Sequence, residues 1–395
     1  MNRWLIFCAV LLIAVAAWGD VRVNDLTRHD QTQPSVAQHG NVIYVAYQDN
    51  ADFNFDVRLA VSDDGGMSFG DSVTPYAADL QNQIDPDVAV GPYGEVVVVW
   101  ADWRNQADYD VYLAVSDDQG DSFSDPVRVT NVHDNTQIKP VTAVDADETI
   151  YVAFTDNRRT TAEDRGVRWD VRVAVSDDGG ATFAPSVKLN PDDDVFAAYP
   201  AIAPLPDGAA VVWFDLSYRI WFSVSHDHGV TWSVPLRLDD NEGAFASMPR
   251  VAADDDRIFA VWNDGVQSSA GQDPTLVYGS GKCLDVYAAY SADGGATFTP
   301  PFRVNQELLL NQQYPAVTFD GPLATIAWSD DREVGNYTIH GVQQFPGGSW
   351  PATGARYDEY PEITLRHLPD LAGPALVWQD YRNGDWDIYF KWLGY

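Results

Sequence analysis

The sequence has almost no cysteine: 2 among 395 residues, Cys8 and Cys283. Cys8 lies in an apolar run, residues 4–17, that follows Arg3 and leads into small residues, as in a secretory signal peptide. If residues 1–19 are removed, one cysteine remains and an intramolecular disulfide is excluded. We therefore expect an exported protein, secreted or periplasmic, that is held together by its own apolar core. The alternative is a retained membrane anchor, for which the run is short.

Basic residues are also scarce. Lys and Arg number 24 against 58 Asp and Glu, which gives a formal net charge of -34. Such a field repels nucleic acid and anionic membrane surfaces, so neither is expected as a partner. Screening limits the field to about 8 Å at physiological salt, so a local arginine cluster could still hold an anionic ligand.

Motifs of several enzyme classes are absent. The chain has no His-Glu-x-x-His, no Cys-x-x-Cys and no Gly-x-Ser-x-Gly. Residues 279–282 resemble part of a phosphate loop, but Leu276 stands where the first glycine should be. No helical periodicity is visible, and no later run approaches the length of a membrane span. The sequence therefore predicts an all-β fold, and it lacks the motifs of the common hydrolases and metalloproteases.

An internal repeat is present, with the pattern S-x-D-x-G-x-[ST]-[FW]. Five copies begin at Ser62, Ser116, Ser176, Ser225 and Ser291. A period near fifty residues is typical of a propeller or an array. In each copy the Asp can accept bonds from backbone N–H groups of its own turn, the Gly supplies an unusual φ, and the aromatic residue packs inward. The repeat is therefore predicted to be scaffold and not a catalytic site.

A longer unit raises the repeat count to seven. Seven apolar runs end in aromatic-x-Asp, at residues 47–49, 100–102, 154–156, 213–215, 262–264, 328–330 and 378–380. One proline leads into each unit, and these are Pro34, Pro86, Pro140, Pro200, Pro249, Pro315 and Pro361. Together with the strands that enter and leave the repeated turn, each unit has four short strands. We predict an all-β, seven-bladed β-propeller of four-stranded blades.

The seventh unit lacks its own fourth strand. Residues 21–24 match the fourth-strand pattern of other units, such as residues 126–129 and 235–238. We therefore predict that the N-terminal strand closes the last blade, which removes the free edges that an open array would leave. Residues 20–395 are expected to form a single domain.

The repeated turn resembles the Asp-box, or BNR, repeat of the sialidase superfamily. This resemblance implies that ligands lie on the face opposite the Asp boxes and that the partner is a carbohydrate or cell-surface glycan. A clear match to true sialidases is not expected, because their F/Y-R-I/L-P motif would place Arg two residues before a strand-opening proline. Those positions hold Thr32, Ile84, Ile138, Ala198, Ser247, Gln313 and Glu359. The family's catalytic domain also has six blades, and seven are counted in this sequence.

Four units extend the aromatic-x-Asp end to Asp-x-Arg. The arginines are Arg104, Arg158, Arg332 and Arg382. Their planar forks are candidates for binding an anionic ligand. The alternative, favoured by the repetition of the motif, is that each Arg pairs with the Asp opening its own third strand or with a neighbouring blade.

Aligning the units on their prolines gives a second set of candidates near the mouth of the central channel. The residue after the proline is charged in three units, and these candidate catalytic residues are Asp87, Arg250 and Glu362. Residues just before the prolines add the candidate ligand contacts Lys139, Tyr199, Tyr314 and Tyr360. Acids for proton transfer beside tyrosines for stacking suit a sugar site. The alternative is ion pairing between blades.

The predicted function is glycan or polysaccharide recognition by a secreted, sialidase-like Asp-box propeller. The alternative is a glycoside hydrolase, exo-sialidase-like, or a polysaccharide lyase with its acids at the channel mouth. No cofactor is predicted, with structural Ca²⁺ as the alternative for the acidic runs 192–194 and 239–242. We expect a monomer without membrane insertion.

Overall fold

The structure is a computed structural model. It describes residues 19–393 except 52–53, 77–80, 131, 133–134, 161–167, 192–195, 241–244, 266–283, 308–309, 334–335, 351, 353 and 359–364. The predicted signal peptide lies almost wholly outside these residues, so export stays a prediction. Within the described part of the chain, no helix has the length and apolar character needed to cross a membrane.

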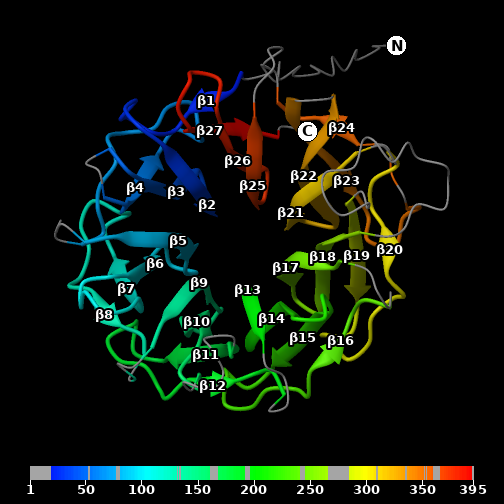
Figure 1. The fold of residues 1–395 in the computed structure, drawn as a ribbon, viewed down its shortest axis with the longest axis horizontal. Coiled ribbons are helices and arrows are strands. Elements are labelled where there is room, and N and C mark those ends of the chain that lie inside the picture. Colours follow the sequence, from blue (N-terminus) through cyan, green and yellow to red (C-terminus); the bar gives the residue numbers. More distant parts are fainter. Residues whose placement is uncertain are drawn as a thin grey trace, which may run out of the picture.

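Seven antiparallel sheets surround a central channel (Figure 1). Blades 1 to 3 consist of β2 (Gln31–His39), β3 (Val42–Asp49) and β4 (Asp56–Ser62); β5 (Gln83–Val90), β6 (Val96–Asp102), β7 (Asp110–Ser116) and β8 (Val127–Arg128); and β9 (Gln137–Val144), β10 (Ile150–Asp156), β11 (Asp170–Ser176) and β12 (Val187–Lys188). In blade 1 the fourth position is reduced to a single bridge between Leu59 and Val73.

Blades 4 to 7 complete the ring. They consist of β13 (Ala197–Leu205), β14 (Gly208–Asp215), β15 (Ile220–Ser225) and β16 (Leu236–Arg237); β17 (Ser247–Asp254), β18 (Arg257–Asp264), β19 (Asp285–Ser291) and β20 (Phe302–Arg303); β21 (Gln312–Asp320), β22 (Leu323–Glu333), β23 (Asn336–Gln344) and β24 (Ala355–Arg356); and β25 (Arg366–Ala372), β26 (Ala375–Asp380), β27 (Asp387–Trp392) and β1 (Val21–Arg22). The predicted seven-bladed propeller is confirmed.

The N-terminal strand closes blade 7, as predicted. Val21 pairs with Phe390 and Arg22 with Tyr389, and the N–H of Val23 donates to the carbonyl oxygen of Ile388 at 2.8 Å. The Val23 side chain is buried in an apolar cluster that contains residues of blades 1 and 7. Because the first strand of the chain pairs with the last, sheet pairing and apolar packing both close the ring.

The second strand of each blade explains the apolar runs of the sequence. β6 is buried along its whole length, because its two faces pack against the neighbouring blades. Five tryptophans at the ends of such strands are fully buried, at positions 100, 213, 262, 328 and 378. The core of the described chain is thus a series of apolar layers between adjacent blades.

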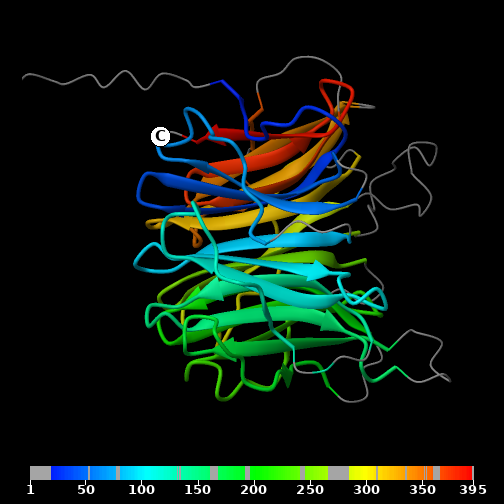
Figure 2. The same cartoon turned by 90° about the vertical axis from the view of Figure 1, so that its left-hand side faces the viewer.

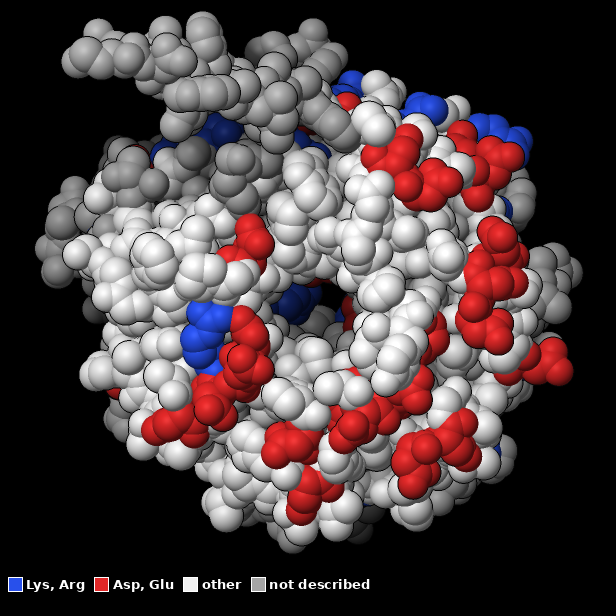
Figure 3. Space-filling model, turned by 180° about the vertical axis from the view of Figure 1, so that it is seen from behind, with Lys and Arg blue, Asp and Glu red and all other residues white. Residues whose placement is uncertain are grey.

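The strands run along the channel axis, so the chain turns gather on two faces (Figure 2). The Asp boxes share one face with the turns between first and second strands, since the amide of Asn41 bonds to Asp63 and the N–H of Gly294 bonds to Asp256. Acidic side chains surround the channel opening on this face (Figure 3). The second-to-third turns lie on the opposite face.

The five Asp boxes stabilise their own turns, as predicted for a scaffold. In the third box, Asp178 accepts bonds from the hydroxyl of Ser176 and from the N–H and hydroxyl of Thr182, at 2.8, 2.8 and 2.6 Å. The N–H of Gly180 donates to the oxygen of Ser176 at 2.9 Å. The other four boxes repeat these four bonds. The box aspartates therefore use their oxygens within their own turns.

Candidate functional site

All seven innermost strands contain the same β-bulge. The pairing register with the second strand shifts around the strand-opening proline in every blade. The residue just before that proline has φ between 50° and 55°, and the seven residues are Gln33, Asp85, Lys139, Tyr199, Met248, Tyr314 and Leu368. Residues other than glycine rarely adopt this left-handed conformation, and each instance costs on the order of 1–3 kcal/mol. The fold thus accepts the same strain seven times at one end of the channel.

Bonds between blades hold these bulges. In four of the bulges, the N–H of the residue before the proline donates a hydrogen bond to the preceding blade. The acceptor is the side chain of the middle residue of that blade's aromatic-x-Asp motif. The pairs are Gln33 with Gln379 at 3.1 Å, Asp85 with Gln48 at 3.4 Å, Tyr199 with Thr155 at 3.2 Å and Tyr314 with Asn263 at 3.0 Å. Blade 2 has Ala101 at this position, and the N–H of Lys139 donates instead to Asp85 at 3.4 Å.

The seven bulge residues surround one cavity of about 400 Å³. This cavity is the channel mouth on the face opposite the Asp boxes, because it lies at the bulged ends of the innermost strands. The structure therefore brings together the predicted ligand contacts Lys139, Tyr199 and Tyr314. It adds Gln33, Asp85, Met248 and Leu368.

The polar side of the mouth is centred on Lys139. Its ammonium group lies 2.5 Å from Asp85 Oδ1 and 3.3 Å from Gln33 Oε1. The same ammonium lies 5.7 Å from the ring centroid of Tyr199, within the range of a cation–π contact. The charge of Lys139 is thus compensated, and its neighbours offer amide, carboxylate and aromatic groups.

Aromatic residues continue outward from the mouth on two sides. Tyr199 stacks on Phe214 with ring centroids 5.6 Å apart, and Phe214 is followed by the exposed Tyr218. On the other side, Tyr314 meets the edge of His367 at 5.8 Å. Burial lowers the pKa of His367 to about 4, so its ring is neutral at neutral pH.

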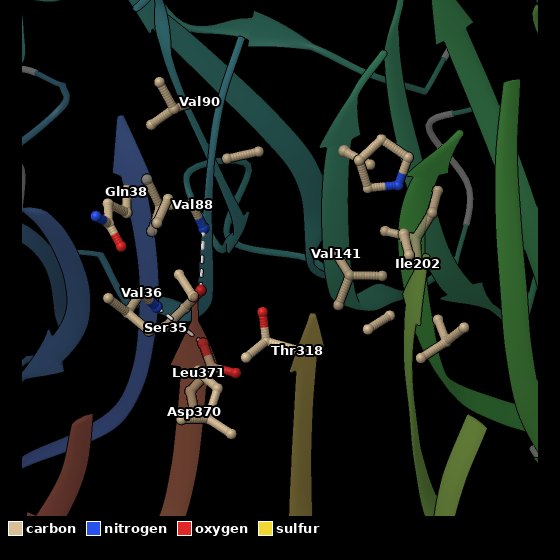
Figure 4. A pocket seen from close by; sticks show the side chains of 18 of the residues that line it. Ser35, Val36, Gln38, Val88, Val90, Val141, Ile202, Thr318, Asp370 and Leu371 are labelled. Carbon is tan, nitrogen blue, oxygen red and sulfur yellow. Dashed lines mark hydrogen bonds between the residues drawn. The ribbon is translucent and has the colours of Figure 1, made fainter. Parts of the chain in front are cut away.

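The floor of the mouth contains three charged residues that also line the channel below, Asp87, Arg250 and Asp370. Asp87 accepts bonds from the hydroxyl of Ser35 at 2.6 Å and from a backbone N–H of blade 3 at 2.7 Å. Asp370 accepts the N–H of Val36 at 2.8 Å, a contact visible in Figure 4. Burial raises the pKa of Asp87 to about 7 and also raises the pKa of Asp370. The guanidinium of Arg250 partly counters both shifts.

The channel below the mouth has a volume of about 730 Å³. Arg250 is the only basic residue among the described residues that line it. Basic atoms are visible inside the opening in Figure 3, although acidic residues surround its rim. Arg250 donates to the carbonyl oxygen of Pro249 at 3.1 Å. It lies within electrostatic reach of both floor carboxylates but makes no ion pair within 4.0 Å with a described residue.

The alignment of the seventh unit on Pro361 is wrong. The bulge of β25 spans Pro369, between His367 and Asp370, so Asp370 and Leu368 occupy the positions assigned to Glu362 and Tyr360. The sequence offers two prolines eight residues apart, and only pairing with β26 decides between them. Glu362 and Tyr360 themselves lie outside the described residues.

The four Asp-x-Arg arginines bind within their own motifs. Each guanidinium contacts the carboxylate two residues earlier; the pairs are Arg104 with Asp102 at 2.6 Å, Arg158 with Asp156 at 2.6 Å, Arg332 with Asp330 at 2.5 Å and Arg382 with Asp380 at 2.5 Å. The partner common to all four is therefore the Asp that closes the second strand, and Arg382 also contacts Asp20 at 2.9 Å. Ligand contact by these arginines stays a prediction, and none of them lines the mouth cavity.

Sequence reasoning missed a groove beside the mouth. It has a volume of about 660 Å³ and shares Gln33, Asp85 and Lys139 with the mouth. Four aromatic residues line it, and they are Phe55, Trp103, Tyr109 and Trp169. Three of them stand directly before the Asp that opens a third strand, in blades 1, 2 and 3. That fixed position was a signal available in the sequence.

No metal site is apparent in the described part of the chain, which holds no group of three or more His, Cys, Asp or Glu side chains arranged for a metal ion. The acidic run 192–194 lies outside the described residues. In the other run, Asp239 accepts the N–H of Ile220 at 2.7 Å and pairs with Arg237. Residues 241 and 242 of this run also lie outside the described residues, so structural Ca²⁺ at the two acidic runs stays untested.

Comparison with known proteins agrees with the Asp-box repeat. Residues 31–212 match the BNR repeat-like domain family, and none of the curated proteins matches the chain. A polysaccharide lyase, the PL25 ulvan lyase, has a TM-score of 0.60 at 13% identity, with 96% of each chain covered. The α-L-arabinofuranosidase Arb93A from Fusarium graminearum has a TM-score of 0.55 at 13% identity, covering 95% of this chain and 98% of that one. The Hadza microbial sialidase Hz136 has a TM-score of 0.51 at 16% identity, covering 76% and 63%. The chain is thus a propeller with Asp-box turns whose first half matches the BNR repeat-like family, and identities this low establish the fold alone.

Proposed function

We propose that this protein binds a neutral glycan at the channel mouth opposite the Asp boxes and does so without catalysis. One observation carries the proposal: seven bulges with the same backbone conformation present side chains of six different types to one cavity. The backbone repeats because the fold needs it, whereas the side chains vary as those of a binding site would. Tyrosine rings beside amide and carboxylate groups are the combination that sugars require, since sugars have both apolar faces and hydroxyl groups.

The charges of the mouth favour a neutral ligand. Its lining contains three acids, Asp85, Asp87 and Asp370, against Lys139 and Arg250. Lys139 is paired with Asp85, and the floor carboxylates partly compensate Arg250. When Asp87 and Asp370 are ionised, an anionic sugar therefore meets no surplus of positive charge, and the chain as a whole is strongly acidic. This argument separates the protein from a binder of sialic acid.

Two further points support a role in carbohydrate recognition outside the cytoplasm. Structural neighbours act on carbohydrates according to their names, and they include an arabinofuranosidase, a sialidase and an ulvan lyase. The N-terminal sequence has the character of a secretory signal peptide. We therefore include secretion in the proposal.

A second candidate function is glycoside hydrolysis at the floor of the mouth. It is favoured by the pKa of Asp87, which burial raises to about 7, as in a carboxylic acid that donates a proton near neutral pH. Asp370 would supply the second carboxylate that such enzymes use. We rank this candidate second because both carboxylates already bond to the backbone of the next blade, which explains them as contacts between blades.

The binding proposal is tested with neutral and anionic polysaccharides. Purified protein is titrated with arabinan, xylan and galactan, and with polygalacturonate and polysialic acid. Tyr199→Ala and Tyr314→Ala should weaken binding of the neutral polymer about tenfold, because each removes a stacking surface of roughly 1 kcal/mol or more. Tyr93→Ala is the matched control, since Tyr93 is 78% exposed and lies in a first-to-second turn on the Asp-box face. Preference for the anionic polymers, or equal binding by all variants, would contradict the proposal.

Hydrolysis is tested on the same polymers by measuring new reducing ends. The second candidate predicts release by the natural protein and none by Asp87→Asn. Absence of release from any polymer, together with measurable binding, would eliminate it and leave recognition.

A further inference from the structure

Aromatic residues recur at one position of the repeat on the face opposite the Asp boxes. The residue directly before the one that faces the closing Asp of the second strand is, in chain order, Phe55, Tyr109, Trp169, Tyr218, Leu284, Tyr337 and Trp386. Six of the seven are aromatic. The carbonyl oxygens of Phe55, Tyr109 and Trp169 accept N–H groups from the first residue of the next blade's innermost strand, at 2.7, 2.7 and 2.9 Å. The backbone of this position is therefore fixed by the fold, and its side chain is free to vary.

In blades 1 to 3 these aromatic residues belong to one continuous groove. Phe55, Tyr109 and Trp169 line it together with Trp103, whose ring meets Tyr109 edge-on at a centroid distance of 4.8 Å. All four side chains are partly exposed, although burial within a propeller would have been available to residues of this size. Aromatic surface left open in a concave site beside polar groups is a common feature of ligand grooves.

The groove adjoins the mouth. Gln33, Asp85 and Lys139 line both cavities, so a ligand that extends from the mouth past these three residues enters the groove. The remaining lining is neutral, with Gln48, Asn82 and Thr136 as its polar side chains. Among the described residues of the groove, the single cation is already paired with the single anion. The groove therefore has the polarity of the mouth and the same lack of surplus charge.

Blade 5 differs at the same position, because Leu284 stands where the other blades have an aromatic residue. In blade 4 the aromatic residue is Tyr218, whose ring packs against Phe214 and Phe245 and does not line the groove. The aromatic residues of this position that line one groove beside the mouth are therefore those of blades 1 to 3.

We infer that the groove holds the continuation of a neutral polysaccharide chain whose end or branch occupies the mouth, with its sugar rings stacked on Trp169, Tyr109 and Trp103. This inference rests on the proposed function and adds to it a ligand of several linked sugars, bound along blades 1 to 3. Stacking tolerates different sugars, because every pyranose or furanose has an apolar face, so the groove supplies affinity and the mouth supplies selectivity.

The test uses linear oligosaccharides of one to six sugars from two neutral series, arabino- and xylo-oligosaccharides, titrated calorimetrically into the full chain. Affinity should rise at least tenfold from the shortest bound member to the hexamer. Trp103→Ala and Trp169→Ala should each remove most of that rise, about five- to tenfold on the hexamer, while changing the affinity of the shortest bound member less than twofold. Tyr93→Ala serves as the control for removal of an exposed aromatic residue elsewhere.

The outcomes separate failure of the groove from failure of the mouth. If hexamer and dimer bind equally and both tryptophan variants match the natural protein, while Tyr199→Ala loses binding, the groove inference is overturned and the proposed function stands. If Tyr199→Ala binds normally but the tryptophan variants do not, the groove alone is the site and the proposed function is overturned. Should no member of either series bind, both are rejected for these sugars. The melting temperature of each variant should lie within about 3 °C of that of the natural protein. This control shows that a loss of binding is not caused by a loss of fold.

Discussion

The two faces of this propeller repeat in different ways. On the Asp-box face the side chains themselves repeat, and five turns contain the same four hydrogen bonds between the same residue types. On the opposite face only the backbone repeats, and seven bulges with nearly the same φ present residues of six different types. The side chains of the Asp boxes form the turn themselves, so they cannot vary. The bulges are held by backbone atoms and by neighbouring blades, so their side chains can vary. The second face is therefore the one available for specific binding.

The glycines of the Asp boxes show how strict the first face is. Two successive residues of each box have positive φ, and the first of them is Gln119 in blade 2 and His228 in blade 4. Positive φ alone therefore does not demand glycine. At the second position a Cβ would lie 2.0 to 3.1 Å from the preceding blade in all five boxes. The box glycine is required because it packs directly on its neighbour.

The largest expected effect follows from this contact. In Gly66→Ala the new Cβ would lie 2.0 Å from Phe390 Cε1, at the junction of the first and last blades, and φ is +84°. Overpacking and backbone strain together should lower the free energy of unfolding by about 2–4 kcal/mol. Urea denaturation measures the loss.

Gly179→Asn is the control for that variant. Gly179 has φ of +69°, but no atom lies within 4 Å of the position that a Cβ would take, and Asn tolerates left-handed φ. The cost of this substitution should stay below about 1 kcal/mol. Equal losses in Gly66→Ala and Gly179→Asn would show that φ, and not contact between blades, makes the Asp boxes uniform.

The sequence predicts the features whose residue types repeat, and it predicts less well the features in which only the backbone repeats. The boxes, the blade count and closure by residues 21–24 could be predicted because each rests on residue types that recur at a fixed spacing. The mouth was located through Lys139, Tyr199 and Tyr314, since the prolines mark the bulges. The position of Asp370 was missed because two prolines compete in the seventh unit, and a choice between them needs the pairing of β25 with β26. The ion pairs of the Asp-x-Arg arginines depend on side-chain conformations that spacing does not specify.

An effect of similar size should distinguish the faces by pH. Burial raises the pKa of Asp87 to about 7, so between pH 4 and pH 7 the folded protein keeps a proton that the unfolded chain has released. Stability contributed by the protonated form is therefore lost as pH rises through this range, by roughly 2–4 kcal/mol. Asp87→Asn cannot ionise and should lack this part of the pH dependence, which urea denaturation at pH 5 and pH 8 measures.

The Asp-box face should respond in the opposite sense. Hydrogen bonds from Ser68 and Ser122 lower the pKa values of Asp64 and Asp118 to about 2. Their stabilisation is complete above about pH 4 and is lost as pH falls toward 2. Asp87→Asn should leave this acid limb unchanged. If the variant keeps the full difference between pH 5 and pH 8, Asp87 is not the group responsible.

The smallest effect is expected at a bulge. Met248 has φ of 50°. In four other blades the bulge N–H bonds to the middle residue of the preceding aromatic-x-Asp motif, but here that residue is Phe214, whose side chain offers no acceptor. Met248→Gly relieves the left-handed strain of a non-glycine residue, but it also adds about 0.5–1 kcal/mol of entropy to the unfolded chain. The two terms nearly cancel, so stability by urea denaturation should change by less than about 1 kcal/mol. A loss above about 2 kcal/mol would mean that the Met248 side chain holds the scaffold, as the box residues do. The contrast between a face fixed by side chains and a face fixed by backbone would then fail at this blade, because both faces would depend on the identity of the residue.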